Sequence, residues 1–306
     1  MRTLSLLATI TKFLLLTCAI ITVLSCSTEQ KKSLPTYRIG YMICNSEKET
    51  LDRFIPLTIY LGQQLNVQFE AVAIDTLNFG KEIDNLHFTH TNSILYIIYN
   101  RFNGLDILAL EKRGELGDRS KGLVVTTQKS GIKSLEDLKG KRMIFGPMLA
   151  PTTFMSQVYA LKKLGFDIDT DLASYSFPSG SFKHEKLIYS VEFGKYDAGA
   201  FPYLDFETME QQGKINRNDY IILAEGPPVP YCNFAVTQKT DEKLAQEFKK
   251  VLLGIQADQL VELPNGERVN ILERAQLDGF TDARDSDFDL LRQMAKETNM
   301  PPYQKY

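Results

Sequence analysis

The sequence lacks the motifs around which most enzymes and metal sites are built. Its 306 residues include three histidines and four cysteines, and they contain no G-x-S-x-G turn, no H-E-x-x-H motif and no Walker phosphate loop. His87 and His90 stand close together, but no cysteine or carboxylate accompanies them at a spacing typical of metal ligands. We therefore expect no catalysis, no metal and no cofactor.

An excess of positive charge is missing as well. The formal net charge is −3, and the Lys and Arg residues are scattered along the chain. Proteins that bind nucleic acid usually gather their basic residues on one surface. We expect no nucleic-acid partner.

The N-terminal part has no apolar run long enough to remain as a membrane-spanning helix. Arg2 and Lys12 precede an apolar stretch of about a dozen residues, whereas a finished span needs about 20. A positive start, a short apolar core and a small residue before the cleavage point mark a secretory signal. The stretch ends in Val23-Leu24-Ser25-Cys26, which resembles the lipobox of bacterial lipoproteins. This resemblance implies cleavage after residue 25 and attachment of lipid, including palmitate, to Cys26. A plain signal peptide or an N-terminal membrane anchor is the alternative.

The next ten residues, STEQKKSLPT, are polar and aperiodic, which is typical of a flexible tether. We predict a signal peptide over residues 1–25, a lipidated tether over 26–36 and a folded part from Tyr37 onward. The chain would be held by lipid on a bacterial membrane and face the periplasm or the exterior. Cys18 leaves with the signal, so Cys44 and Cys232 remain. The sequence leaves open whether these two form a disulfide.

Strand and helix patterns alternate along the folded part. Apolar strand patterns occupy residues 37–43, 67–73, 107–110, 122–127, 141–146, 197–201 and 220–224. Apolar residues at helical spacing lie between them, and residues 87–99 begin as a strand. This alternation predicts an α/β fold with largely parallel sheets.

Three features predict where helices begin. Ser46 and Glu49 have the spacing of a capping box. Pro56 is unfavourable inside a helix, so we expect a helix to start or kink there. Thr240 is the expected N-cap of a long helix that carries Leu244 and Phe248.

Five segments, taken in order, resemble one known family. They are Arg53–Leu61, Ser130–Gly146, Val191–Ala200, Pro228–Val236 and Leu277–Phe288. Together they resemble the phosphate/phosphite/phosphonate-type substrate-binding proteins of ABC transporters. The resemblance implies a two-lobed, periplasmic-binding-protein-like α/β fold with two crossing hinge strands and a ligand cleft between the lobes. It places lobe one at residues 37–123 plus 234–306 and lobe two at 124–233.

The resemblance also implies a function. We expect a solute-binding lipoprotein that captures a small anion, of the phosphonate or phosphite kind, for an ABC importer and its permease. The alternative keeps the fold and changes the role, so that the chain senses a solute and signals to a membrane receptor kinase or cyclase.

Lobe two supplies most of the cleft residues that the resemblance implies. Thr152 and Thr153 fall on the hydroxyl-rich helix start of the family, where free N–H groups and the helix dipole favour an anion. An ordinary N-cap would place threonine there equally well. His184 is in register with the ligand histidine of the family, and Lys183 competes with it for that role. Asp197 matches an aspartate that reaches the ligand.

On lobe one, Asn92 and Ser93 occupy the turn before a helix that faces the cleft in the family, and Tyr96 lies one helical turn further on. The cleft tyrosine that precedes the crossing strand in the family is absent. Arg119 and Lys121 stand in that region, and either is a candidate to bind the anion instead. The alternative is that they are simply solvated, which is expected more of Lys121.

Overall fold

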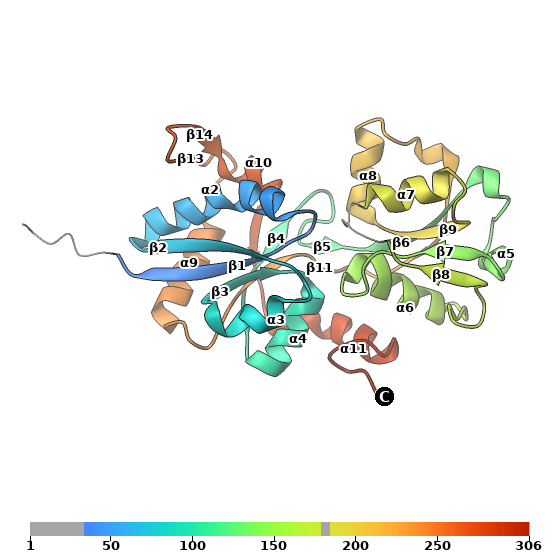
Figure 1. Ribbon diagram of the computed structural model, residues 1–306, viewed down its shortest axis with the longest axis horizontal. Coiled ribbons are helices and arrows are strands. Elements are labelled where there is room, and N and C mark those ends of the chain that lie inside the picture. The colour runs from blue at the N-terminus through green and yellow to red at the C-terminus, as the bar shows by residue number, and fades with distance from the viewer. Residues whose placement is uncertain (1–33, 179–183, 306) are drawn as a thin grey trace, which may run out of the picture. The chain divides into compact units, whose positions relative to one another are not determined.

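Two large β-sheets organise the folded part of the chain (Figure 1). The computed structural model describes residues 34–178 and 184–305. The predicted signal peptide, Cys26, most of the tether and Lys183 lie outside the described residues. Residues 36–306 belong to one unit, separate from residues 1–35.

The first sheet has the strand order β15-β4-β12-β3-β1-β2. β1 runs parallel to β2 and β3, whereas β12 and β15 pair antiparallel with their neighbours. Its strands are β1 (Thr36–Met42), β2 (Gln68–Ile74), β3 (Phe88–Thr91), β4 (Asp106–Lys112), β12 (Asn233–Val236) and β15 (Gly279–Asp282).

Both faces of this sheet are covered. In β12, Phe234 and Val236 point into one core while Ala235 points into the other, as the two-residue period of a strand requires. One face packs on α2 (Glu47–Leu65), α9 (Glu242–Leu253), α10 (Ile271–Ala275) and the small hairpin of β13 (Leu260–Glu262) and β14 (Arg268–Asn270). The other face packs on α3 (Phe79–Glu82), α4 (Ser93–Asn103) and α11 (Asp289–Glu297).

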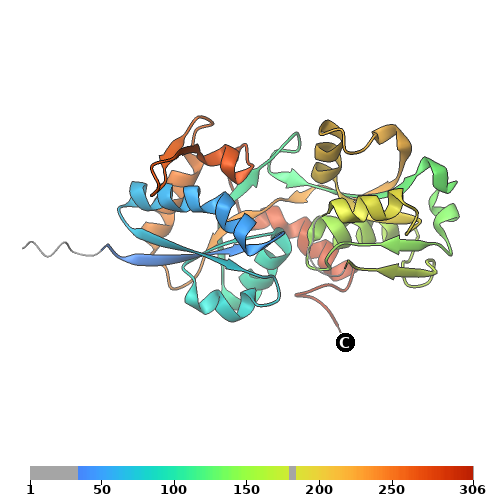
Figure 2. The ribbon, with the colours of Figure 1, turned by 45° about the horizontal axis from the view of Figure 1, so that its top comes forward.

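The second sheet has the order β10-β6-β9-β7-β8. Helices α7 and α8 cover one face of this sheet and α6 covers the other (Figures 1 and 2). Leu123 and Val125 belong to the core beneath α7 and α8, and Val124 between them belongs to the core beneath α6. The strands are β6 (Gly122–Thr127), β7 (Arg142–Ile144), β8 (Ser174–Ser176), β9 (Ala198–Pro202) and β10 (Tyr220–Glu225). The helices are α5 (Leu135–Leu138), α6 (Ser156–Lys163), α7 (Glu185–Glu192) and α8 (Tyr203–Gln211).

The chain crosses between the sheets twice, and the crossings pair with each other. β5 (Arg119–Ser120) leads from β4 to β6, and β11 (Val229–Pro230) leads from β10 back to β12. β5 and β11 are antiparallel neighbours. α11 lies against both α4 and α6, and the Lys163 ammonium lies 2.7 Å from a Glu297 carboxylate oxygen.

Several sequence expectations need correction. Each sheet is mixed rather than largely parallel, because β12 and β15 in the first sheet and β6 and β10 in the second run antiparallel to their neighbours. α2 begins at Glu47, with the Ser46 side chain accepting a hydrogen bond from the Glu49 amide, and it continues through Pro56. Pro56 is buried, so packing of the helix offsets the hydrogen bond that the proline removes.

Thr240 does not cap α9. The Asp241 side chain accepts hydrogen bonds from the amides of the first turn instead, and the Thr240 hydroxyl donates to the His87 carbonyl at 2.8 Å. The histidines are also used structurally: His87 Nδ1 accepts from the Arg38 amide, and His90 pairs with the buried Glu111 at 2.7 Å. Within residues 34–178 and 184–305 no cluster of metal-ligating side chains occurs.

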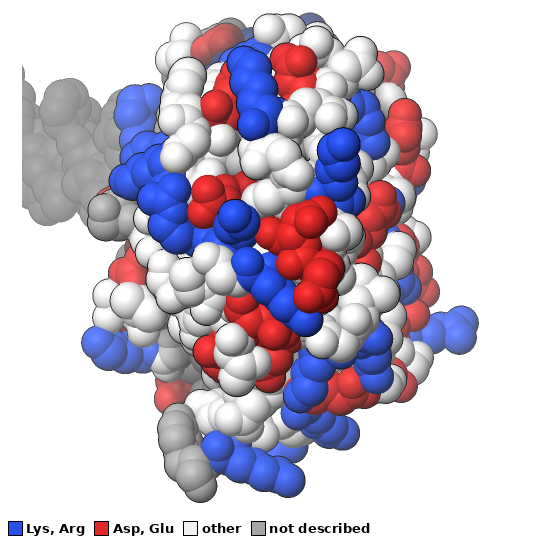
Figure 3. Space-filling model, turned by 90° about the vertical axis from the view of Figure 1, so that its right-hand side faces the viewer, with Lys and Arg blue, Asp and Glu red and all other residues white. Residues whose placement is uncertain are grey.

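In the part of the chain that the structure describes, no helix combines the length and the apolar character that a membrane crossing requires. On the face shown in Figure 3, Lys and Arg side chains are interspersed with Asp and Glu. This face therefore carries no field of one sign.

We expect Phe248→Ala to lower the free energy of unfolding by about 3–5 kcal/mol. Phe248 is fully buried in α9, and its ring stacks on Phe88 at 4.0 Å between centroids. Phe193→Ala is the matched control, because that ring is 79% exposed, and it should change stability by less than about 0.5 kcal/mol. Urea unfolding followed by circular dichroism measures both, and equal effects would contradict this account of the core.

Candidate functional site

A cavity opens between the two sheets, at the level where the chain crosses from one to the other. It consists of two adjoining chambers of about 350 and 400 Å³, whose walls share four residues. These are Cys44, Asn45, His184 and Tyr231. Each volume lies in the range of small-molecule sites. The first chamber is walled mainly by apolar side chains and the second mainly by polar and charged ones.

The second sheet contributes a helix start to the first chamber. After β7 the chain turns at Gly146 and enters a π-helical turn, Pro151–Met155, which continues as α6. A Cβ atom at Gly146 would lie 2.4 Å from the Thr153 Cβ, so only glycine permits this close approach. Thr152 lines the chamber. Thr153 is fully buried behind it and does not line it.

The first sheet contributes the start of α4. Asn92 caps this helix by accepting from the Leu95 amide at 3.0 Å, and its amide group donates to the Leu149 carbonyl at 2.8 Å. Asn92 thus bridges the two halves of the wall. Ser93 also lines the chamber and is fully buried, and its hydroxyl has no hydrogen-bond partner among the described residues. A buried hydroxyl without a partner is costly, so this one is suited to a bound solute.

The charged chamber is centred on His184 and Asp205. The His184 ring, at the start of α7, pairs with the Asp205 carboxylate on α8. Burial pushes the pKa of Asp205 upward, but the positive charges of His184, Arg113 and Arg53 outweigh burial and hold it below its usual value. Asp205 is therefore a carboxylate at neutral pH.

Two guanidinium groups line the same chamber. Arg53 donates to the Ala275 carbonyl at 2.7 Å, and Arg113 donates to the Tyr231 hydroxyl at 3.2 Å. Tyr231 and Asp205 help to raise the pKa of Arg113 further above its already high value. No carboxylate of the described residues lies within 4 Å of either group. By contrast, Lys214 in the same wall pairs with Glu185.

The structure thus brings together four of the residues expected from the sequence: Thr152, His184, Asn92 and Ser93. It does not bring the other four to the cavity. Thr153 is buried, and Tyr96 is buried against Phe288 while its hydroxyl donates to Asp285 at 2.8 Å.

Asp197 and Arg119 also have structural partners. The Asp197 carboxylate accepts from the amide and the side chain of Arg142, at 2.9 and 3.2 Å. Arg119 lies 3.4 Å from Asp118 and donates to the Asp287 carbonyl at 3.3 Å. Neither lines the cavity, whereas Asp205 and Arg113, which the sequence did not single out, do.

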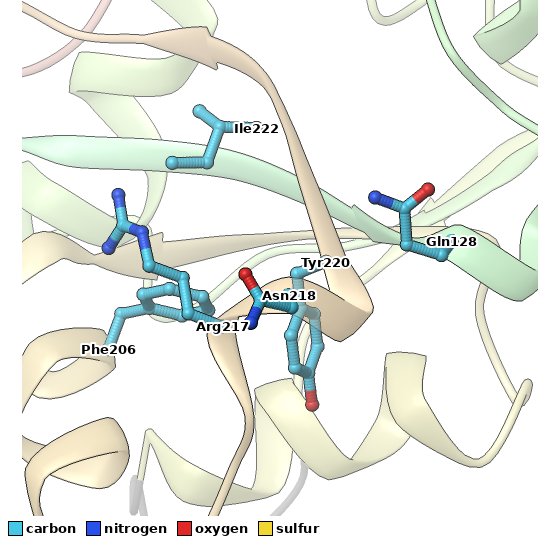
Figure 4. A pocket seen from close by; sticks show the side chains of 6 residues that line it. All are labelled: Gln128, Phe206, Arg217, Asn218, Tyr220 and Ile222. Atoms are coloured by element: carbon cyan, nitrogen blue, oxygen red, sulfur yellow. The ribbon is translucent and has the colours of Figure 1, made fainter.

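A separate hollow of about 310 Å³ lies on the second sheet (Figure 4). Arg217 dominates it, but its guanidinium already pairs with Glu207 and lies over the Phe206 ring at 5.6 Å. Because its guanidinium is already paired, Arg217 is poorly placed to bind a charged solute in this hollow. The cavity between the sheets is therefore the better candidate.

A family model for the periplasmic substrate-binding proteins of phosphonate ABC transporters matches residues 39–288. The chain belongs to this family. Its members are substrate-binding proteins, so the expectation of a binding protein rather than an enzyme is confirmed. Their periplasmic place implies a location outside the cytoplasm.

Solved structures confirm the expected two-lobed fold. PhnD1 of Prochlorococcus marinus in complex with methylphosphonate aligns with a TM-score of 0.71 and 17% identity, over 86% of this chain and 98% of that one. A binding-protein component of a phosphonate ABC transporter from Pseudomonas aeruginosa aligns with a TM-score of 0.69 and 15% identity, over 87% of each chain.

A curated relative has a different role. The tetrathionate sensor histidine kinase TtrS of Salmonella typhimurium is 26% identical over 239 residues, which is 72% of this chain. The match spans 40% of the kinase, so this chain corresponds to less than half of that relative.

Two thiols also lie in the cavity wall. Cys44 and Cys232 both line the first chamber, and both are free thiols in the described part of the chain. Burial, together with the charge of Glu111, raises the pKa of Cys232 well above the usual thiol value. The Cys232 thiol is therefore protonated at neutral pH.

We expect Cys232 to react with iodoacetamide more slowly in the folded protein than in urea. The rate in urea divided by the rate in the folded protein should fall as the pH rises above about 8.5. A raised pKa lowers the thiolate fraction only below that pKa, whereas simple shielding would slow the reaction at every pH. Mass spectrometry of the Cys232 peptide, in a Cys44→Ser background, gives the two rates. A ratio that does not change with pH would contradict the raised pKa.

Proposed function

We propose that this chain captures a small anion, of the phosphonate or phosphite kind, in the cavity between its sheets and delivers it to the permease of an ABC importer. The main support is the pair of cavity arginines, Arg53 and Arg113, which have no carboxylate partner within 4 Å among the described residues. Guanidinium groups are well suited to hold phosphonate and carboxylate oxygens.

Three further groups favour an anion at the same place. Thr152 lies at a helix start, where the dipole and free N–H groups attract negative charge. His184 is common to both chambers, and Ser93 offers an unused hydroxyl. We take residues 37–123 with 234–306 as one lobe and 124–233 as the other, so that their closure would enclose the solute.

Calorimetry with phosphate, phosphite and methylphosphonate tests this proposal. We expect at least one of them to bind, and the double variant His184→Ala/Thr152→Ala to weaken binding about tenfold or more, because each lost hydrogen bond to a charged group costs about 1.5–3 kcal/mol. Asp197→Asn is the control and should leave the affinity unchanged, since Asp197 lies outside the cavity. Heat from none of the anions, or full binding by the double variant, would refute the proposal.

The similarity to a sensor kinase supports a second candidate, in which the chain reports a bound solute to a membrane receptor kinase or cyclase. Uptake of labelled solute by cells separates the two. Loss of the chain abolishes uptake if it feeds an importer, and it leaves uptake intact while abolishing a solute-dependent response if it feeds a sensor.

We also propose that lipid on Cys26 anchors the chain, through the tether at residues 26–36. A flexible linker of ten residues reaches roughly 16–19 Å, so such a tether would let the protein search only a thin layer next to its membrane. A partner must then lie within that layer.

Cys26→Ser tests the anchor. We expect the wild-type chain to sediment with membranes and to incorporate labelled palmitate, and the variant to incorporate none and to lose its anchorage by lipid. Cys18→Ser is the matched control, because it lies in the same segment and should keep both properties. Palmitate label retained by the Cys26→Ser variant would disprove the assignment.

A further inference from the structure

The first chamber is far more apolar than a small inorganic anion requires. Met42 and Leu77 contribute to it from the first sheet and the loop after β2, and Pro147, Met148 and Leu149 contribute from the segment after β7. Pro230, on the crossing strand β11, completes this wall. A methyl group provides a single carbon and cannot cover such a surface.

Two of these side chains are exposed although they are large and apolar. Leu77 is 84% exposed and Met148 is 47% exposed. They belong to opposite lobes and line the same chamber. Large apolar groups that remain open to water from both sides of a cavity gain free energy when a solute covers them.

The apolar chamber and the charged chamber adjoin each other. Asn45, His184 and Tyr231 belong to both walls, so a solute that extends across them meets Arg53 and Arg113 at one end and the apolar wall at the other. Both chambers fall within the size range of sites for organic molecules, and each has room for many more atoms than a one-carbon phosphonate.

We propose that the solute is an amphiphilic organic anion, with an acidic head group on the side of the arginines and an extended apolar body between Leu77 and Met148. This inference rests on the proposed capture of an anion and adds the class of solute. The arginines and His184 hold the charge, and the exposed apolar side chains supply selectivity for the body.

A series of n-alkylphosphonates from methyl to hexyl tests the proposal. Binding is measured by calorimetry on the full-length protein in lipid nanodiscs, with empty nanodiscs as the blank. We expect the Kd to fall about fourfold for each added methylene, which corresponds to about 0.8 kcal/mol for each buried CH₂ group. In Leu77→Ser/Met148→Ser the gain should shrink to less than about twofold per methylene.

Leu164→Ser/Phe193→Ser is the matched control. Leu164 and Phe193 are 61% and 79% exposed and lie outside the cavity, so this variant should keep the fourfold gain. An affinity for methylphosphonate that does not improve with chain length would overturn the inference and leave the proposed anion capture standing. A gain that survives loss of Leu77 and Met148 would overturn it as well. Binding of no phosphonate in the series would overturn the inference, and the absence of heat with phosphate and phosphite as well would reject the anion capture.

Discussion

The antiparallel pairing of β5 with β11 is the constraint on which the site depends. Ser120 lies opposite Val229, and the Tyr231 amide donates to the Asp118 carbonyl at 2.9 Å just beyond the pair. Because both crossings between the sheets run through this short ladder, it sets where the two halves of the cavity wall face each other. It also fixes Tyr231, whose hydroxyl accepts a hydrogen bond from Arg113, at the junction of the two chambers. The floor of the cavity and the connection between the lobes are thus the same piece of backbone.

Several polar groups of the cavity come from places where strands end. Asn92 and Ser93 follow β3, Arg113 follows β4, and Asp205 lies just after β9, in the first turn of α8. Backbone at such positions leaves the sheet and exposes side chains in a fixed direction, while the apolar strands behind stay packed on both faces. This placement explains how residues of the charged chamber can follow residues of a well-packed core directly in the sequence. The cost of partly burying the Asp205 carboxylate, whose side chain is 29% exposed, is offset because three basic side chains lie near it.

The sequence predicted the family, the two-lobed fold and those site residues that sit at helix starts, because these signals are local. Thr152, Asn92 and Ser93 belong to short polar turns before apolar runs. This pattern can be recognised from neighbouring residues alone, without knowing which distant residues they contact. The sequence could not show that Tyr96 lies away from the cavity. Its hydroxyl donates to Asp285, which is 189 residues away in the sequence and reaches Tyr96 only in the folded chain. Arg53 and Arg113 carry no local signal either: one lies within a helix, the other after a strand, and only the tertiary fold places both on one wall. The expected helix start at Pro56 was wrong for a related reason, since packing outweighed the local rule, and the expected kink there stays a prediction.

The contact between Asn92 and Leu149 bears on how the lobes operate. The two halves of the wall already touch through this 2.8 Å hydrogen bond, yet Leu77 and Met148 in the same chamber remain open to water. In the proposed closure, this hydrogen bond would hold one point of the wall while the more exposed parts approach the solute. Closure driven by covering apolar side chains would depend on the shape and length of the solute body, whereas attraction of the head group would depend on charge alone. In the proposed binding mode, separate chambers would let one cavity attract many anions and close on few, and this division would suit delivery to a permease and reporting to a sensor equally well.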